Sequence, residues 1–153
     1  MEKRQIAELY ELYAKDVYRL ALSWLRNTHD AEDVLQSIFL KLLDKDVAIF
    51  PGGEKAWLLT CTANACKDHL RTIWHRNTQP LDDQIVAPTT EDRSLWEAVG
   101  KLKPTYRAVV HLYYYEGYRQ DEIAGILGIS RTAVQTRMQR ARENLKKELN
   151  DNG

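Results

Sequence analysis

The stretch from Arg119 to Arg142, RQDEIAGILGISRTAVQTRMQRAR, constrains the fold more than any other part of the chain. Gly128 suits a tight turn, because a residue without a Cβ adopts a positive φ at little steric cost. Ser130 is placed to act as an N-cap, whose hydroxyl accepts a hydrogen bond from an unpaired backbone N–H. Ala124 is small enough to let two helices approach closely. The stretch is therefore predicted to form a helix-turn-helix.

The second helix of this pair is predicted to have an apolar face and a polar face. Apolar residues recur every three or four positions along it, and this spacing predicts that the buried residues are Val134, Met138, Ala141, Leu145 and Leu149. The residues on the polar face can reach phosphates and base edges in a DNA major groove, and they are Arg131, Gln135, Thr136, Gln139 and Arg140. The alternative is a plain helical hairpin with a solvated basic face. The agreement between the turn and both helices favours DNA binding.

Three further amphipathic segments upstream predict helices over 4–26, 30–45 and 54–75, with a Pro-Gly-Gly loop at 46–53. The first helix is predicted to bury Ile6, Leu9, Tyr10, Tyr13, Val17, Leu20, Ala21 and Trp24. The second is predicted to bury Ala31, Val34, Leu35, Ile38, Leu42 and Leu43, and to expose Asp33, Gln36, Ser37 and Lys41. The third is predicted to bury Trp57, Leu58, Cys61, Ala65 and Leu70. Another face of the third helix carries Asn64, Lys67, Asp68 and Arg71, although a single Asn in a helix is commonly only a solvated residue.

Residues 77–92, NTQPLDDQIVAPTTED, are predicted to form a linker, because they contain two prolines and show no periodicity. This segment has four acidic residues and no Lys or Arg, whereas residues 119–147 have seven basic and three acidic residues. The net charge of the 153-residue chain is nevertheless zero, so its basic charge is local. A local excess of positive charge fits a nucleic-acid site. The chain is predicted to be all-α, with two small helical domains at 1–76 and 93–153.

The second predicted domain opens with a short helix, SLWEAVGKL, and continues with a helix from Pro104 to Gly117. Proline is favoured at the first position of a helix and glycine just past its end. The residues predicted to cover the helix-turn-helix core are Tyr106, Val109, Val110, Tyr113 and Tyr114. Base stacking by the tyrosines is an alternative, but their helical spacing favours core packing.

The sequence has no arrangement typical of an enzyme or a metal site. Cys61 and Cys66 are five residues apart and would point about 140° apart on a helix, which argues against a metal shared with His69. Cys61 is predicted to be a small core residue, and a redox role for Cys66 is left open. The polar N-terminus is unlike a signal peptide, and no apolar run reaches the roughly 18 residues of a membrane span.

Together the two halves resemble an extracytoplasmic-function (ECF) RNA polymerase sigma factor of the sigma-70 family, over about Leu9 to Leu149. The first half resembles region 2 of that family, in DAEDVLQSIFLKL (30–42) and KAWLLTCTANACKDHLR (55–71). The second half resembles region 4, in LKPTYRAVVHLYYYEGYRQDEIAGILGISRTAVQTRMQRAR (102–142). Both blocks in this order make the resemblance specific.

The resemblance implies roles for individual residues. Asp33 and Gln36 match the face that docks on the clamp helices of the polymerase β′ subunit. Phe50 matches an aromatic residue in the loop that holds a base flipped out of the −10 duplex. The remaining −10 positions are Asn64, Lys67, Asp68 and Arg71, and the −35 positions are Arg131, Gln135, Thr136, Arg137, Gln139 and Arg140. Gln135 stands where the family often has Lys or Arg, which exchanges a charge for an amide.

The resemblance also implies function and partners. It implies that the chain directs transcription initiation at promoters and catalyses no reaction itself. It also implies no cofactor, metal or small-molecule substrate. The implied partners are core RNA polymerase (the β′ clamp helices and the β subunit), promoter DNA and an anti-sigma factor. The implied location is the bacterial cytoplasm, or the membrane where an anti-sigma factor holds the chain there. The alternative is a conventional helix-turn-helix regulator that binds an operator as a dimer, and it leaves the first domain without a role.

Overall fold

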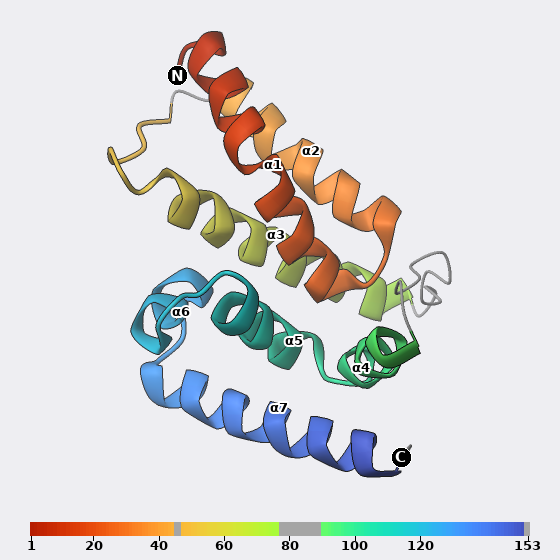
Figure 1. Ribbon diagram of the computed structural model, residues 1–153. Helices are drawn as coiled ribbons and strands as arrows, with labels where there is room; N and C mark the ends of the chain where they lie inside the picture. The colour runs from red at the N-terminus through yellow and green to blue at the C-terminus, as the bar shows by residue number, and fades with distance from the viewer. Residues whose placement is uncertain (45–46, 77–89, 152–153) are drawn as a thin grey trace. The chain divides into compact units, whose positions relative to one another are not determined.

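The computed structural model describes residues 1–44, 47–76 and 90–151, and these residues form helices and no strand. The predicted all-α class is confirmed. The chain divides into two compact units, Met1–Pro80 and Leu81–Gly153, and each has its own core (Figure 1).

The first unit contains α1 (Lys3–Leu25), α2 (Thr28–Asp44) and α3 (Glu54–Arg76). Helix α1 contacts both α2 and α3, and α2 also contacts α3. The largest fully buried side chains of this unit are Val17, Leu20, Trp24, Leu42, Leu58 and Leu59. The unit is therefore a three-helix bundle in which each helix contributes to one core.

The turn between α1 and α2 explains why α2 begins at Thr28, two residues earlier than predicted. Arg26 ends α1 with a left-handed φ of 52°, and its N–H donates to the carbonyl oxygen of Leu22 at 2.8 Å. The side-chain oxygen of Asn27 then accepts a hydrogen bond from the N–H of Asp30 at 3.0 Å. Asn27 thus acts as an N-cap, which satisfies one of the unpaired donors of the first helical turn.

The buried face of α3 differs from the predicted one. The side chains that are buried are Leu58, Leu59, Thr62, Ala63 and Cys66, whereas those of Trp57, Cys61, Ala65 and Leu70 are only partly buried. The hydroxyl of Thr62 donates to the carbonyl oxygen of Leu58 at 2.7 Å, so a polar side chain fits in the core. The prediction that Cys61 is the core cysteine was wrong, and Cys66 occupies the core instead.

Helix α2 also departs from its predicted face at one position. Leu43 is 52% exposed although it was predicted to be buried, and Phe39 is only 6% exposed. The Phe39 ring meets the edge of the Tyr10 ring of α1, with 5.0 Å between the ring centroids. Tyr10 was also predicted to be buried but is 47% exposed, and Tyr10, Phe39 and Leu43 line a surface cavity between α1 and α2.

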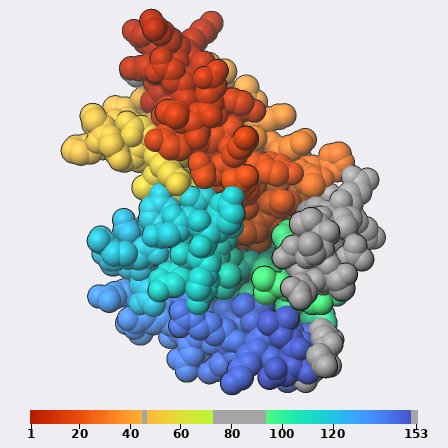
Figure 2. Space-filling model, in the orientation of Figure 1, coloured from red at the N-terminus to blue at the C-terminus, as the bar shows by residue number. Residues whose placement is uncertain are grey.

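The second unit contains α4 (Thr90–Gly100), α5 (Pro104–Val110), the π-helix η1 (His111–Tyr115), α6 (Gln120–Leu127) and α7 (Arg131–Asp151). The predicted linker was 77–92, but α4 already includes residues 90–92, and the acidic stretch at 77–89 lies outside the described residues. Helix α7 contacts α4, α5 and α6. In the space-filling view, the cyan segment that includes α6 lies against the blue α7 (Figure 2).

The helix-turn-helix forms as its capping residues predict. Gly128 ends α6 with φ 68°, and the N–H of Ile129 donates to the carbonyl oxygen of Ala124 at 3.1 Å. The hydroxyl of Ser130 accepts a hydrogen bond from the N–H of Ala133 at 3.0 Å, which fixes the start of α7. Val134, Met138 and Ala141 are buried, as predicted.

The apolar face of α7 ends earlier than predicted. Leu145 packs against a cluster of Leu102, Tyr106 and Ala141. Leu149 is 40% exposed, because the last turn of α7 extends beyond this cluster. The prediction that Leu149 is buried was therefore wrong.

The predicted helix from Pro104 to Gly117 changes from α to π geometry at His111. The N–H of Glu116 donates to the carbonyl oxygen of His111, five residues back, at 3.1 Å. Leu112 remains fully buried, but Tyr114 is 60% exposed and was wrongly predicted to cover the core. The wider turn directs this tyrosine to the surface.

Candidate polymerase-binding and DNA-binding surfaces

The six predicted −35 residues lie in the first ten positions of α7, opposite or beside its buried face. Four of them are exposed, namely Arg131, Gln135, Gln139 and Arg140, and two are partly buried, namely Thr136 and Arg137. Ser130 and Gly128 orient the start of this helix by the contacts described above. The side-chain amide of Gln139 donates to the carboxylate of Glu143 at 3.3 Å, so an acidic residue also lies on this surface.

Arg142 is a basic residue of α7 that the sequence analysis did not single out. Its Nε donates to the hydroxyl oxygen of Tyr114 at 3.0 Å. Its guanidinium carbon lies 5.9 Å from the ring centroids of both Tyr113 and Tyr114. The three side chains connect η1 to α7, and the sequence signal for Arg142 was its place among the seven basic residues of 119–147.

The predicted −10 residues of α3 lie on a solvent-facing side of the first unit. Asn64, Asp68 and Arg71 are exposed, and Lys67 is partly buried. The guanidinium of Arg71 donates to the Asp68 carboxylate at 2.8 Å, and both side chains are more than 70% exposed. An exposed pair of this kind contributes little stability, so either side chain can leave it for another partner.

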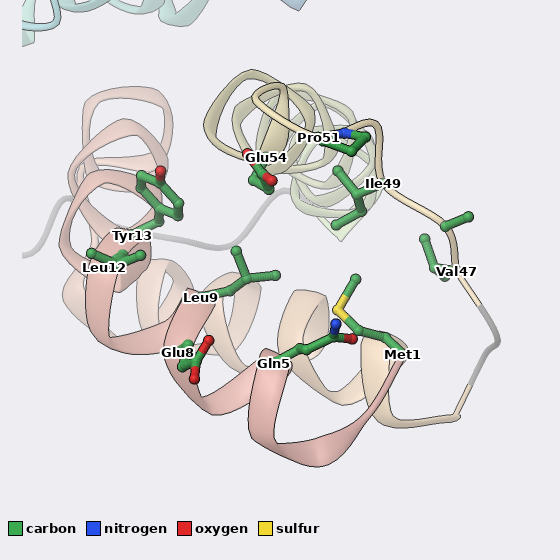
Figure 3. Close-up of a pocket in the computed structure, with 11 residues that line it drawn as sticks. Met1, Gln5, Glu8, Leu9, Leu12, Tyr13, Val47, Ile49, Pro51 and Glu54 are labelled. Atoms are coloured by element: carbon green, nitrogen blue, oxygen red, sulfur yellow. The ribbon is translucent and has the colours of Figure 1, made fainter.

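The loop before α3 presents the predicted aromatic residue. The Phe50 side chain is 85% exposed, and the carbonyl oxygen of Phe50 accepts a hydrogen bond from the N–H of Gly53 at 2.9 Å. A cavity of about 590 Å³ lies between the first half of α1 and this loop, and Leu9, Ile49 and Pro51 are among its lining residues (Figure 3). Phe50 is not one of the residues that line this cavity.

The predicted polymerase-binding residues share one exposed face of α2. Asp33 and Gln36 are exposed and three residues apart, which places them about one turn from each other on the same side. Ser37 is partly buried, and its hydroxyl donates to the carbonyl oxygen of Val34 at 2.9 Å. Asp33 and Gln36 therefore form the polar surface, whereas the Ser37 hydroxyl is already used within the helix.

A close contact between two ionisable side chains connects α2 to α3. The Nε2 atom of His69 lies 3.2 Å from Oδ2 of Asp30, and Asp30 is only 6% exposed. Asp30 lies in the first turn of α2, where a negative charge also interacts favourably with the helix dipole. This pair was not predicted from the sequence, because its two residues are far apart in the chain.

The two cysteines have different surroundings. Cys66 is fully buried, and burial raises the pKa of its thiol. Cys61 is partly buried, and burial raises the pKa of its thiol while the charge of Lys41 acts in the opposite direction. Across residues 1–44, 47–76 and 90–151, no three or more His, Cys, Asp or Glu residues are grouped to hold a metal ion. Within the same ranges, every helix is too short or too polar to cross a membrane.

Both halves of the chain match known protein families. Residues 9–76 match sigma-70 region 2, and residues 92–145 match sigma-70 region 4. The chain is 30% identical over 154 residues to the RNA polymerase sigma factor CarQ of Myxococcus xanthus, covering 94% of this chain and 88% of CarQ. It is also 30% identical over 152 residues to the ECF RNA polymerase sigma factor SigE of Mycolicibacterium smegmatis, covering 91% of this chain. The chain spans only 59% of the length of that SigE.

Two solved structures resemble the fold. One is the sigma factor RpoE of Bartonella quintana in complex with the anti-sigma factor NepR, with a TM-score of 0.74 and 19% identity, covering 96% of this chain and 98% of RpoE. The other is CnrH in complex with the cytosolic domain of CnrY, with a TM-score of 0.64 and 26% identity, covering 99% of this chain and 92% of CnrH.

These comparisons define a class of promoter-recognition proteins built from region 2 and region 4. The chain belongs to the sigma-70 family of RNA polymerase sigma factors, and several of its relatives, SigE among them, are named ECF sigma factors. This family is not a class of enzymes. The alternative of a conventional helix-turn-helix regulator is not favoured, because the match includes the first unit as well as the second.

Proposed function

We propose that the chain binds core RNA polymerase and directs transcription initiation at promoters that it selects by their −10 and −35 elements. The observation that carries this proposal is the presence of region 2 and region 4 in one chain, in that order. The exposure of Asp33 and Gln36 on α2 and of Arg131 and Gln135 on α7 supports it, because each set is accessible to a partner.

In this proposal the first unit has two surfaces with different partners. Asp33 and Gln36 of α2 dock on the clamp helices of the polymerase β′ subunit. On α3 and its preceding loop, Asn64, Lys67, Asp68, Arg71 and Phe50 contact the −10 element. An exposed aromatic ring such as that of Phe50 can stack on a base that has left the duplex, which offsets part of the few kcal/mol that flipping costs.

The second unit contributes the −35 contacts. Helix α7 enters the major groove with its N-terminal end, as the second helix of a helix-turn-helix does. The same unit is proposed to contact the polymerase β subunit. Two modest binding units in one chain raise the overall affinity through effective concentration, provided that both sites are within reach.

An anti-sigma factor is the proposed regulatory partner. The support is that RpoE is solved in complex with the anti-sigma factor NepR. The proposed location is the bacterial cytoplasm, where core polymerase and promoter DNA are found. A membrane-spanning anti-sigma factor would hold the chain at the membrane until a signal releases it.

Co-purification with core RNA polymerase tests the proposed function. The tagged full chain should retain bacterial core polymerase on an affinity resin, and the complex should start transcription from a subset of promoters in a genomic library. Failure to retain core polymerase would refute the proposal. A chain that bound a palindromic operator as a dimer without polymerase would instead be a conventional regulator.

The substitution Arg140→Ala tests the placement of α7 on DNA. Arg140 is exposed, and if it reads a guanine edge, its loss should weaken binding by about 1–3 kcal/mol only at promoters with that base. If it contacts a phosphate, the loss of affinity should be the same for all promoters. The slope of log K against log salt concentration should then become smaller by about one. The measurement is the binding of holoenzyme to −35 variants at two salt concentrations.

Lys147→Ala, which removes the same charge seven residues further along α7, is the matched control. Unchanged binding of Arg140→Ala to every variant at both salt concentrations would show that this surface does not face DNA.

A further inference from the structure

We infer that Arg142 is a further DNA-binding residue, whose guanidinium is held by Tyr113 and Tyr114 and contacts a backbone phosphate beside the groove that α7 enters. This inference rests on the proposed function of α7 and adds to it a contact that the sequence comparison did not assign. It starts from a cluster of three side chains in which Tyr113 is partly buried and Tyr114 is exposed.

The position of Arg142 on α7 is compatible with DNA. At about 100° per residue, Arg142 lies within about 20° of both Arg131 and Gln135 around the helix axis. The buried residues Met138, Val134 and Ala141 lie about 40°, 80° and 100° from Arg142 around the axis, so Arg142 lies at the border between the buried face and the exposed face. Arg142 therefore continues the edge of the proposed −35 surface towards the C-terminal end of α7.

The distance along the helix indicates a phosphate rather than a base. Arg142 follows Arg131 by eleven residues, which corresponds to about 16 Å along the axis. The major groove is about 12 Å wide, and a recognition helix inserts its N-terminal residues. A side chain so far from the inserted end lies beyond the base edges, next to the sugar–phosphate backbone.

The contacts of Arg142 hold its side chain in one orientation. Its Nε donates to the hydroxyl of Tyr114 at 3.0 Å, and its guanidinium carbon is 5.9 Å from both tyrosine ring centroids. The hydrogen bond uses one of the five N–H donors of the guanidinium. A long side chain that is ordered before binding loses less conformational freedom when it binds a phosphate.

The π-helix explains how the tyrosines reach Arg142. Tyr114 is 60% exposed, and it belongs to the turn in which η1 departs from α geometry. Its ring is in contact with the edge of the Tyr113 ring, with 4.9 Å between the centroids, and its hydroxyl accepts the hydrogen bond from Arg142. Tyrosine is suited to that role, since its ring attracts a cation and its hydroxyl accepts a hydrogen bond.

The neighbouring charges are mixed, and their balance favours an anion at this edge. Lys146 lies one turn beyond Arg142 on the same side and is exposed. Glu143 is the nearby acidic residue, and it accepts the hydrogen bond from Gln139 at 3.3 Å. At about 100° per residue, Glu143 lies about 100° from Arg142 around the helix axis, on the same side as Gln139.

The test measures the binding of holoenzyme, formed from the full chain and core polymerase, to promoter DNA over a range of salt concentrations. For Arg142→Ala, the slope of log K against log salt should decrease by about 0.9, and affinity at 0.1 M salt should fall about eightfold. The loss should be the same for all −35 sequences, because a phosphate carries no sequence information.

Two conservative variants separate the charge from its support. Arg142→Lys should keep the salt slope of the parent chain, because it keeps the charge. Tyr114→Phe should also keep the slope, but it should weaken binding by a smaller factor than Arg142→Ala, because it removes only the hydrogen bond that orients the guanidinium. Arg4→Ala, an exposed basic residue of α1, is the charge-matched control and should bind like the parent.

The outcomes distinguish this inference from the proposed function. A parent holoenzyme that does not form or does not bind promoter DNA would overturn both. If the parent holoenzyme binds promoter DNA and the Arg142→Ala variant has the same slope of log K against log salt, only the role of Arg142 would be overturned. An Arg142→Ala variant that is less stable to heat but has the parent salt slope would show that the cluster only joins η1 to α7, and this result would also overturn the inference.

Discussion

Replacing both Asp33 and Gln36 with alanine is expected to weaken binding of the chain to core RNA polymerase by about 30-fold to several thousand-fold. The expected factor corresponds to about 2–5 kcal/mol, which is typical when one partner of a buried polar or charged contact is removed from an interface. Both side chains are exposed on one face of α2, so they are accessible to the clamp helices. The measurement is the dissociation constant of the complex with core polymerase.

The fold should survive this double substitution, because substitutions at exposed positions usually change stability by less than about 0.5 kcal/mol. Thermal unfolding of the double variant should therefore match that of the parent chain. Asp44→Ala is the matched control, since Asp44 is an exposed acid at the other end of the same helix. An unchanged dissociation constant for the double variant would remove Asp33 and Gln36 from the polymerase surface.

Replacing Met138 with alanine is expected to destabilise the second unit by about 2–5 kcal/mol. Met138 is 1% exposed and lies between Val134 and Ala141 on the buried face of α7, so its removal leaves a cavity where α7 meets the core. The measurement is hydrogen–deuterium exchange of peptides from residues 104–149, whose protection should fall. This readout is specific to the second unit and does not depend on how the first unit unfolds.

Leu149→Ala is the matched control for Met138, because it also removes an apolar side chain from α7. Leu149 is 40% exposed, so its removal should change the protection of the same peptides far less. Equal effects of the two substitutions would contradict the assignment of Met138 to the core and of Leu149 to the end of the packed surface.

The features of the fold that were predicted correctly depend on local rules. Gly128 and Ser130 specify the end of α6 and the start of α7, because positive φ and N-capping involve only neighbouring residues. The apolar spacing of Val134, Met138 and Ala141 is regular, and all three are buried. The helix-turn-helix was therefore predictable from the sequence in some detail.

The buried face of α3 was not predictable in the same way. Its sequence has small or apolar residues on several sides, so both Cys61 and Cys66 fit an apolar stripe. The hydroxyl of Thr62 donates a hydrogen bond to the carbonyl oxygen of Leu58, and this bond allows a polar residue to be buried in the core. Packing against α1 and α2 determines which face of α3 is buried. The sequence of α3 alone does not indicate which helices pack against it.

The sequence indicated candidate surfaces but not the contacts that support them. Asp33 and Arg140 could be named, because their motifs resemble those of a known family. The pair of Asp30 and His69 joins two helices, and the cluster of Arg142 with Tyr114 joins η1 to α7. Neither contact follows from spacing, since each depends on residues that only the folded chain brings together.

The burial of Cys66 has a consequence for oxidative stress. Peroxide reacts with the thiolate rather than the thiol, and it must reach the sulfur to do so. Cys66 is fully buried and burial raises its thiol pKa, so both requirements are unfavourable in the folded chain. Cys61 is partly accessible, but burial also raises its pKa. Oxidation of Cys66 is therefore disfavoured for as long as the first unit stays folded.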